Sequence, residues 1–246
     1  MLTRFHSAHI IQSLVLNSVI TYMKKQTVSK DQVVNRVLEA WMHLSDRSYG
    51  KLMVAICHTQ IGDYPQALYD YRFALLHFLE NRQDWYGTSQ PNLFIDTFVM
   101  ANQPGLYSKV KDEIETYKQD RRGSSLAALY SYALLHLLAG QDKEALNYVP
   151  GLLKYPKVKD FSAIGEMIRA LGNDNASGFD DALMNLLIAH RGMAKFGSLR
   201  ETPEGILCLP AMSLSKIALE RGLHSSIENG YLSRGYLAYL NSSVSE

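Results

Sequence analysis

Cysteine is scarce in this chain, which has only Cys57 and Cys208 among its 246 residues. Both stand in apolar segments with helical spacing, so we expect buried free thiols, with a disulfide or metal site as the alternative. Such low cysteine use fits a reducing cytosol. The chain is long enough to bury a sizeable core without metals or disulfides.

Long apolar runs are also missing. No stretch of roughly 18 consecutive apolar residues occurs, so we expect no membrane span. The apolar-rich segment 3–25 is interrupted by polar residues such as His6, His9 and Asn17, and no small-residue cleavage site follows it. A secretory signal peptide is therefore not expected, and we expect a cytoplasmic protein.

Neither charge sign is in excess. Lys and Arg number 25 and Asp and Glu number 24, which gives a formal net charge of +1. This balance argues against direct binding to nucleic acid through a broad basic surface, although it leaves room for a local patch. Apolar residues make up 47% of the chain, which indicates a globular rather than a disordered protein.

Recognisable catalytic motifs are absent from the sequence. It has no P-loop, no dinucleotide fingerprint and no G-x-S-x-G. Residues 213–216 match the S-x-x-K of penicillin-recognising enzymes, but S-D-N and K-T-G partners are missing and residues 108–111 match equally well. We interpret Ser213, Lys216 and Glu220 as a solvated polar strip, with Lys216 and Glu220 paired at i,i+4. An enzyme is the least favoured class.

Metal sites and cofactors are not expected either. The segment 173–178 imitates the first half of a calcium loop, but Met184 stands where a bidentate Glu is required, so helix capping explains these residues better. The eight histidines show no metal-binding spacing. Four of them are expected to be hydrogen-bonded core or groove residues on apolar helices: His58, His77, His136 and His190.

Helical periodicity runs through at least eight segments and predicts an all-α fold. We expect a first helix over 3–25 and a second from the capping box at Ser29 and Gln32. A connection over 45–50 and a third helix over 51–60 should follow. The charged segment 104–119 is expected to be a solvated outer helix.

A helix–turn–helix pattern recurs along the chain. The sequence GDYxxAL at 62–68 resembles the turn between the helices of a tetratricopeptide repeat, and a similar sequence, GQDKEAL, stands at 140–146, with a looser copy at 172–183. We therefore predict an array or compact bundle of antiparallel helix pairs, loosely tetratricopeptide-like. A single domain over 1–246 is expected, with a subdivision near residue 122 as the alternative.

The last third of the chain is predicted to form two helical hairpins, over 161–197 and over 204–232. The first has apolar residues at spacings of three and four, which places them on one helix face. That face consists of Phe179, Ala182, Leu183, Leu186, Leu187, His190 and Met193. The second has a similar face consisting of Leu207, Ala211, Leu214 and Ala218, and Gly222 follows as a stop signal.

A family resemblance lies in the same region. Its residues, in chain order, are Ala182-Leu183, His190, Leu209-Pro210, Ala218, Arg221-Gly222 and Tyr231-Leu232. This order resembles the Imm49 family of immunity proteins from bacterial polymorphic toxin systems, although Ser233 stands where the family pattern has Pro. The resemblance implies a protein that binds a cognate toxin domain, such as a nuclease, and neutralises it by occlusion. The alternative is a helical-repeat adaptor for a peptide or protein partner.

Two patches are candidates for the partner contact. The first is Asp84, Trp85 and Tyr86, in a long polar connection where loops on a rigid scaffold usually place recognition residues. Trp and Tyr bury large areas at little entropic cost, so they are favoured anchors. The alternative is that Trp85 folds inward.

The second patch is the inter-helix turn with Asp174, Asp180 and Asp181. Its acidic groups would suit a basic toxin, as enzymes that act on nucleic acid tend to be. The alternative is that Asp180 and Asp181 only stabilise the N-terminus of their helix.

Overall fold

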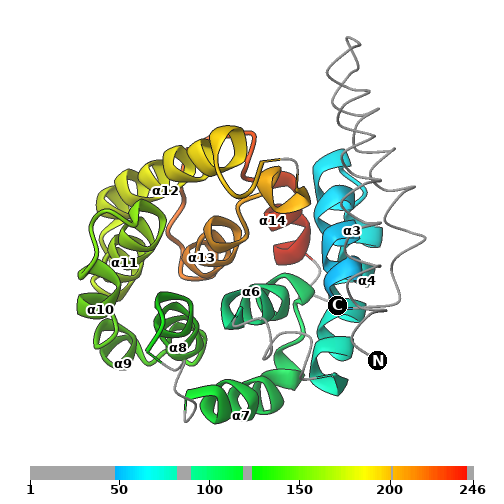
Figure 1. Ribbon diagram of the computed structural model, residues 1–246, viewed down its shortest axis with the longest axis horizontal. Coiled ribbons are helices and arrows are strands. Elements are labelled where there is room, and N and C mark those ends of the chain that lie inside the picture. The colour runs from blue at the N-terminus through cyan, green and yellow to red at the C-terminus, as the bar shows by residue number, and fades with distance from the viewer. Residues whose placement is uncertain (1–47, 82–89, 119–123, 201, 243–246) are drawn as a thin grey trace, which may run out of the picture.

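The computed structural model describes residues 48–81, 90–118, 124–200 and 202–242 (Figure 1). Within these ranges the secondary structure is helical and contains no strand, which confirms the predicted all-α fold. The helices expected over 3–25 and from Ser29 lie outside the described residues, as do Asp84, Trp85 and Tyr86.

The described α-helices are α3 (Ser48–Ile61), α4 (Tyr64–Glu80), α6 (Pro91–Ala101), α7 (Tyr107–Lys118), α8 (Leu126–Leu138), α9 (Asp142–Leu146), α10 (Val149–Leu153), α11 (Lys159–Gly172), α12 (Ala176–Phe196), α13 (Leu209–Glu220) and α14 (Arg234–Ser242). Short 3-10 helices occur at η1 (Pro104–Leu106) and η2 (Pro203–Gly205).

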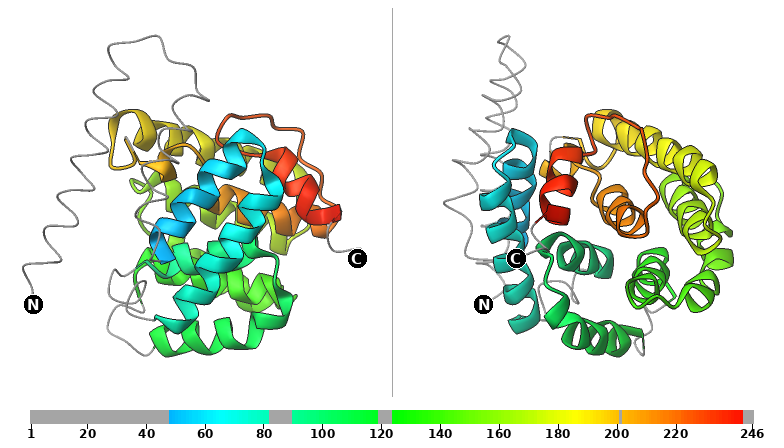
Figure 2. Two further views of the ribbon diagram at one scale, coloured as in Figure 1. Left: turned by 90° about the vertical axis from the view of Figure 1, so that its right-hand side faces the viewer. Right: turned by 180° about the vertical axis from the view of Figure 1, so that it is seen from behind.

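The helices are arranged as a ring around an inner group. Figure 1 shows α7, α9, α10, α11 and α12 curving around α6, α8 and α13, with α3 and α4 closing one side. The inner helices pack on one another, and α14 lies between α13 and the α3–α4 pair in both Figure 1 and Figure 2. A single hydrophobic core runs through the described helices from α3 to α14.

The inner position of α13 overturns the predicted solvated strip. Ser213 and Lys216 are buried there together with Ser215, because neighbours surround the helix instead of leaving one side to water. Only Glu220, at the end of the helix, is exposed. The predicted pair does form, because Lys216 Nζ lies 2.5 Å from Glu220 Oε1. The aliphatic part of the Lys216 side chain is buried, and its ammonium group reaches the exposed carboxylate at the end of the helix.

The turns at 62–64 and 140–142 connect helices as predicted. Gly62 and Gly140 have φ angles of 85° and 69°, a left-handed conformation that glycine adopts without strain. The turn at 173–175 serves capping rather than calcium binding, because Asn175 Oδ1 accepts a hydrogen bond of 3.0 Å from the Gly178 N–H at the start of α12. The predicted capping chemistry is therefore confirmed.

Two predicted boundaries are wrong. Helix α3 begins at Ser48 within the expected connection, and the Ser48 side chain shares a hydrogen bond of 2.7 Å with His77 Nδ1 on α4. The segment 204–232 is not a helical hairpin, because α13 is followed by non-helical chain from Leu223. The Leu223 N–H donates to the Ala218 carbonyl at 2.9 Å and so closes the helix.

Several predicted burial patterns are confirmed. Cys57 and Cys208 are buried free thiols, and α7 is a largely solvated outer helix with only Val110, Ile114 and Tyr117 buried. In the part of the chain that the structure describes, no helix is long and apolar enough to cross a membrane.

Candidate partner-binding surface

Helix α12 has one buried side and one apolar side left exposed. The predicted face packs into the core from Phe179 to His190, whereas its last member, Met193, is half-buried. On the opposite side Met184, Ile188 and Phe196 are 40%, 60% and 87% exposed. A helical period of 3.6 residues places Met184 and Ile188 along one stripe, and Phe196 is the last residue of the helix, turned about 80° from Ile188. Together with Asp181 they form what we call the α12 outer face.

Acidic residues mark the beginning of this face. Asp174 is exposed in the turn before α12, Asp181 is exposed on the helix and Asp180 is half-buried. The structure therefore places all three predicted residues at one end of α12. Asp180 and Asp181 lie beyond the first turn, so stabilising the helix N-terminus does not account for them. Their carboxylates make no hydrogen bond or ion pair with the described residues.

The charge changes sign along the same helix. Arg191 and Lys195 are exposed in its last two turns, next to Phe196. Cations there also interact favourably with the carbonyl end of the helix. The α12 outer face thus runs from an acidic end, over apolar side chains, to a basic end.

Histidines mainly join helices together. His58 Nδ1 lies 2.7 Å from Asp70 Oδ2, which links α3 to α4, and His136 Nδ1 lies 2.8 Å from Gln141 Oε1. With the Ser48–His77 bond, these contacts confirm the expected hydrogen-bonded roles of His58, His77 and His136. Within the described ranges, no group of three or more His, Cys, Asp or Glu side chains could hold a metal ion.

His190 is the buried member of the set. Its ring packs edge-to-face on Tyr231 with centroids 5.0 Å apart, and its Nε2 has no hydrogen-bond partner among the described residues. Burial lowers the pKa of His190 to about 4, and the backbone of Gly205 opposes this shift.

Sequence reasoning missed one buried acid, Asp96 on α6. It is fully enclosed by α6, α8 and α13, and the Tyr130 hydroxyl donates to its Oδ1 at 2.5 Å. Burial raises the pKa of Asp96 to about 7, while Tyr130 and Ser213 favour the charged form. Its Oδ2 has no direct partner in the described part of the chain. An acid sealed from solvent in this way cannot meet a substrate.

The residues of the family resemblance hold the C-terminal segment in place. Tyr231 contacts His190 through its ring, and its carbonyl accepts a hydrogen bond of 2.9 Å from the Cys208 N–H. Arg221 donates to the Leu137 carbonyl at 2.9 Å and to Asp142 at 2.8 Å. These positions therefore have scaffold roles.

The comparisons with known proteins give no match to a family model, a curated protein or a solved structure.

Proposed function

We propose that this protein is an immunity protein that binds a cognate bacterial toxin domain and neutralises it by occlusion. The observation that carries the proposal is the α12 outer face, where exposed apolar side chains continue from an acidic turn. In the C-terminal third, the order of residues that resembles the Imm49 family also supports an immunity protein.

The α12 outer face has the physical features of a binding surface. Its apolar groups lie on a helix whose other side is fixed in the core, so little conformational entropy is lost when they bind. Phe196 is the largest exposed apolar group of this face and can anchor in a pocket of the partner, while Ile188 and Met184 extend the apolar contact along α12.

Charge suggests how the partner approaches. The unpaired carboxylates of Asp174, Asp180 and Asp181 would attract a basic domain and orient it towards the start of α12. A toxin that acts on nucleic acid has such a basic surface at its active site. Covering that surface would block its substrate without any chemistry by the immunity protein.

The first test uses the protein encoded beside this gene as the candidate toxin. Ile188→Asp is expected to weaken binding by about tenfold or more, because it places a charge within the apolar contact. The measurements are growth protection on co-expression, affinity by calorimetry and thermal melting. Asp112→Asn on α7, on another side of the ring, is the control and should bind like the parent.

A second test separates charge from apolar contact. Asp180→Asn combined with Asp181→Asn is expected to slow association several-fold and to reduce its salt dependence, with little change in dissociation. Full protection by both the folded Ile188→Asp variant and the folded double variant would place the interface elsewhere. Capture of short peptides instead of one folded domain would favour the adaptor class.

A further inference from the structure

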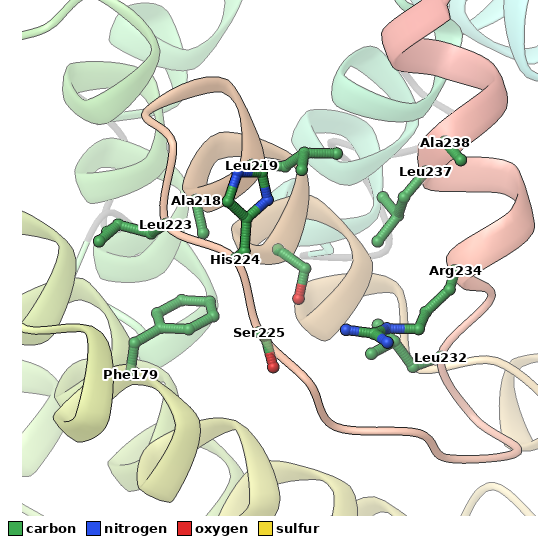
Figure 3. Close-up of a pocket in the computed structure, with 11 residues that line it drawn as sticks. Phe179, Ala218, Leu219, Leu223, His224, Ser225, Leu232, Arg234, Leu237 and Ala238 are labelled. Atoms are coloured by element: carbon green, nitrogen blue, oxygen red, sulfur yellow. The ribbon is translucent and has the colours of Figure 1, made fainter.

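A cavity lies on the inner side of α12, away from the α12 outer face. It has a volume of about 240 Å³, is partly open to solvent, and is lined by α12, α13, α14 and the chain between α13 and α14 (Figure 3). Its walls are mainly apolar and consist of Phe179, Ala218, Leu219, Leu223, Leu232 and Leu237. Such a lining binds apolar groups by removing them from water.

Two polar groups at this cavity lack partners. Ser215 lines it with only 7% of the residue exposed, and its Oγ has no hydrogen-bond partner in the described part of the chain. Arg234 makes no hydrogen bond or ion pair with any described residue. Figure 3 shows its guanidinium reaching from α14 towards the middle of the cavity. An unpaired buried hydroxyl is costly, and a ligand oxygen would relieve that cost.

The electrostatic environment of the cavity favours an anion. Arg234 is the first residue of α14, so the positive end of that helix lies beside its guanidinium. His224 lies on the other side of the cavity (Figure 3). Glu228 and Arg234 both border a neighbouring depression, but no ion pair joins them, so the Arg234 charge is available.

We propose that this cavity binds a small monocarboxylate with an apolar chain of about eight carbons. The carboxylate would accept hydrogen bonds from Arg234 and Ser215, and the chain would cover Phe179, Leu219 and Leu237. The size follows from the volume, which equals about eight water volumes of ~30 Å³. One cation within an apolar lining suits a single negative charge better than a phosphate. The proposal is independent of toxin binding.

The test titrates octanoate into the full chain by calorimetry. Saturable one-to-one binding is expected, with 1-octanol binding about tenfold more weakly because it lacks the charge-assisted bonds. Butyrate should also bind more weakly, because its short chain covers little of the apolar wall. Equal affinity for octanoate and octanol, or binding that does not saturate, would overturn the proposal.

Two variants locate the ligand. Arg234→Gln should reduce octanoate affinity by about tenfold and leave octanol affinity unchanged. Ala238→Phe should weaken both ligands, because Ala238 borders the cavity from an exposed position where a larger ring can fill the space without disturbing the core. Arg191→Gln on the far side of α12 is the matched charge control. Unchanged octanoate binding in either folded test variant would refute the assignment.

Discussion

Leu187→Asp is expected to unfold the protein, whereas Ile188→Asp at the next position should melt like the parent. Leu187 is 1% exposed and Ile188 is 60% exposed on the same helix. An unpaired charge at Leu187 would cost several kcal/mol, a large part of a total stability of about 5–15 kcal/mol. Thermal melting followed by far-UV circular dichroism measures both variants.

Leu214→Asp extends the same test to the inner helix α13. Leu214 is fully buried, so a carboxylate there has no route to water and should also abolish folding. Phe196→Asp, at an 87% exposed site, is a second control that should keep the parental melting temperature. A folded Leu214→Asp or Leu187→Asp variant with parental melting would contradict the assignment of the buried faces.

The buried face of α12 could be predicted from the sequence because α12 borders solvent. In a helix with one solvent-exposed side, the buried residues recur with the helical period, and Leu183, Leu186 and His190 do so. The sequence also indicates the exposed apolar residues Met184 and Ile188, because they interrupt the side of α12 that should be polar.

The polar residues of α13 could not be placed in the same way. A helix surrounded by α6, α8, α11, α12 and α14 has no solvent side, so periodicity does not separate Ser213 and Lys216 from its apolar residues. The bond between Asp96 and Tyr130 joins positions 34 residues apart on different helices. No local pattern encodes such a contact.

Only part of the candidate site could be predicted. The acidic turn was found from the composition of the sequence, and the structure adds its position at the end of an exposed apolar stripe. The cavity depends on the non-helical chain after Gly222, which lies within the segment predicted to be a helical hairpin. Residues 224–230 include Ser, Asn and Gly, which favour turns, so the sequence does contain a signal for non-helical chain there. The walls of the cavity come from separate helices, so no sequence pattern could have indicated it.

Asp96→Asn is expected to stabilise the protein above pH 7 by a few kcal/mol. There the folded state holds a buried carboxylate, which burial disfavours, and Asn keeps an oxygen to accept the Tyr130 hydroxyl. Between the ordinary pKa of 3.8 and the folded pKa of about 7, the folded state binds the proton more tightly. This contribution to stability is therefore present at low pH and is lost as pH rises, by up to about 1.4 kcal/mol per unit.

His190 gives a pH dependence of the opposite sign. Its pKa falls from 6.5 to about 4 on folding, so in that range the unfolded state binds the proton more tightly. Its contribution to stability is present above pH 6.5 and is lost as pH falls. Between about pH 4 and 6.5 the contributions of Asp96 and His190 therefore oppose each other and largely cancel.

Removing either Asp96 or His190 should reveal how the other one makes the free energy of unfolding depend on pH. Across that range the stability of Asp96→Asn should rise with pH relative to the parent, and that of His190→Gln should fall. Burial also raises the pKa of Glu204, but Glu204 is present in every variant and drops out of the differences. Urea unfolding at fixed ionic strength, at pH values spaced between the two folded pKa values, measures these slopes. Curves parallel to the parent for both variants would mean that neither group is perturbed by burial, because a group with equal pKa in both states contributes no slope.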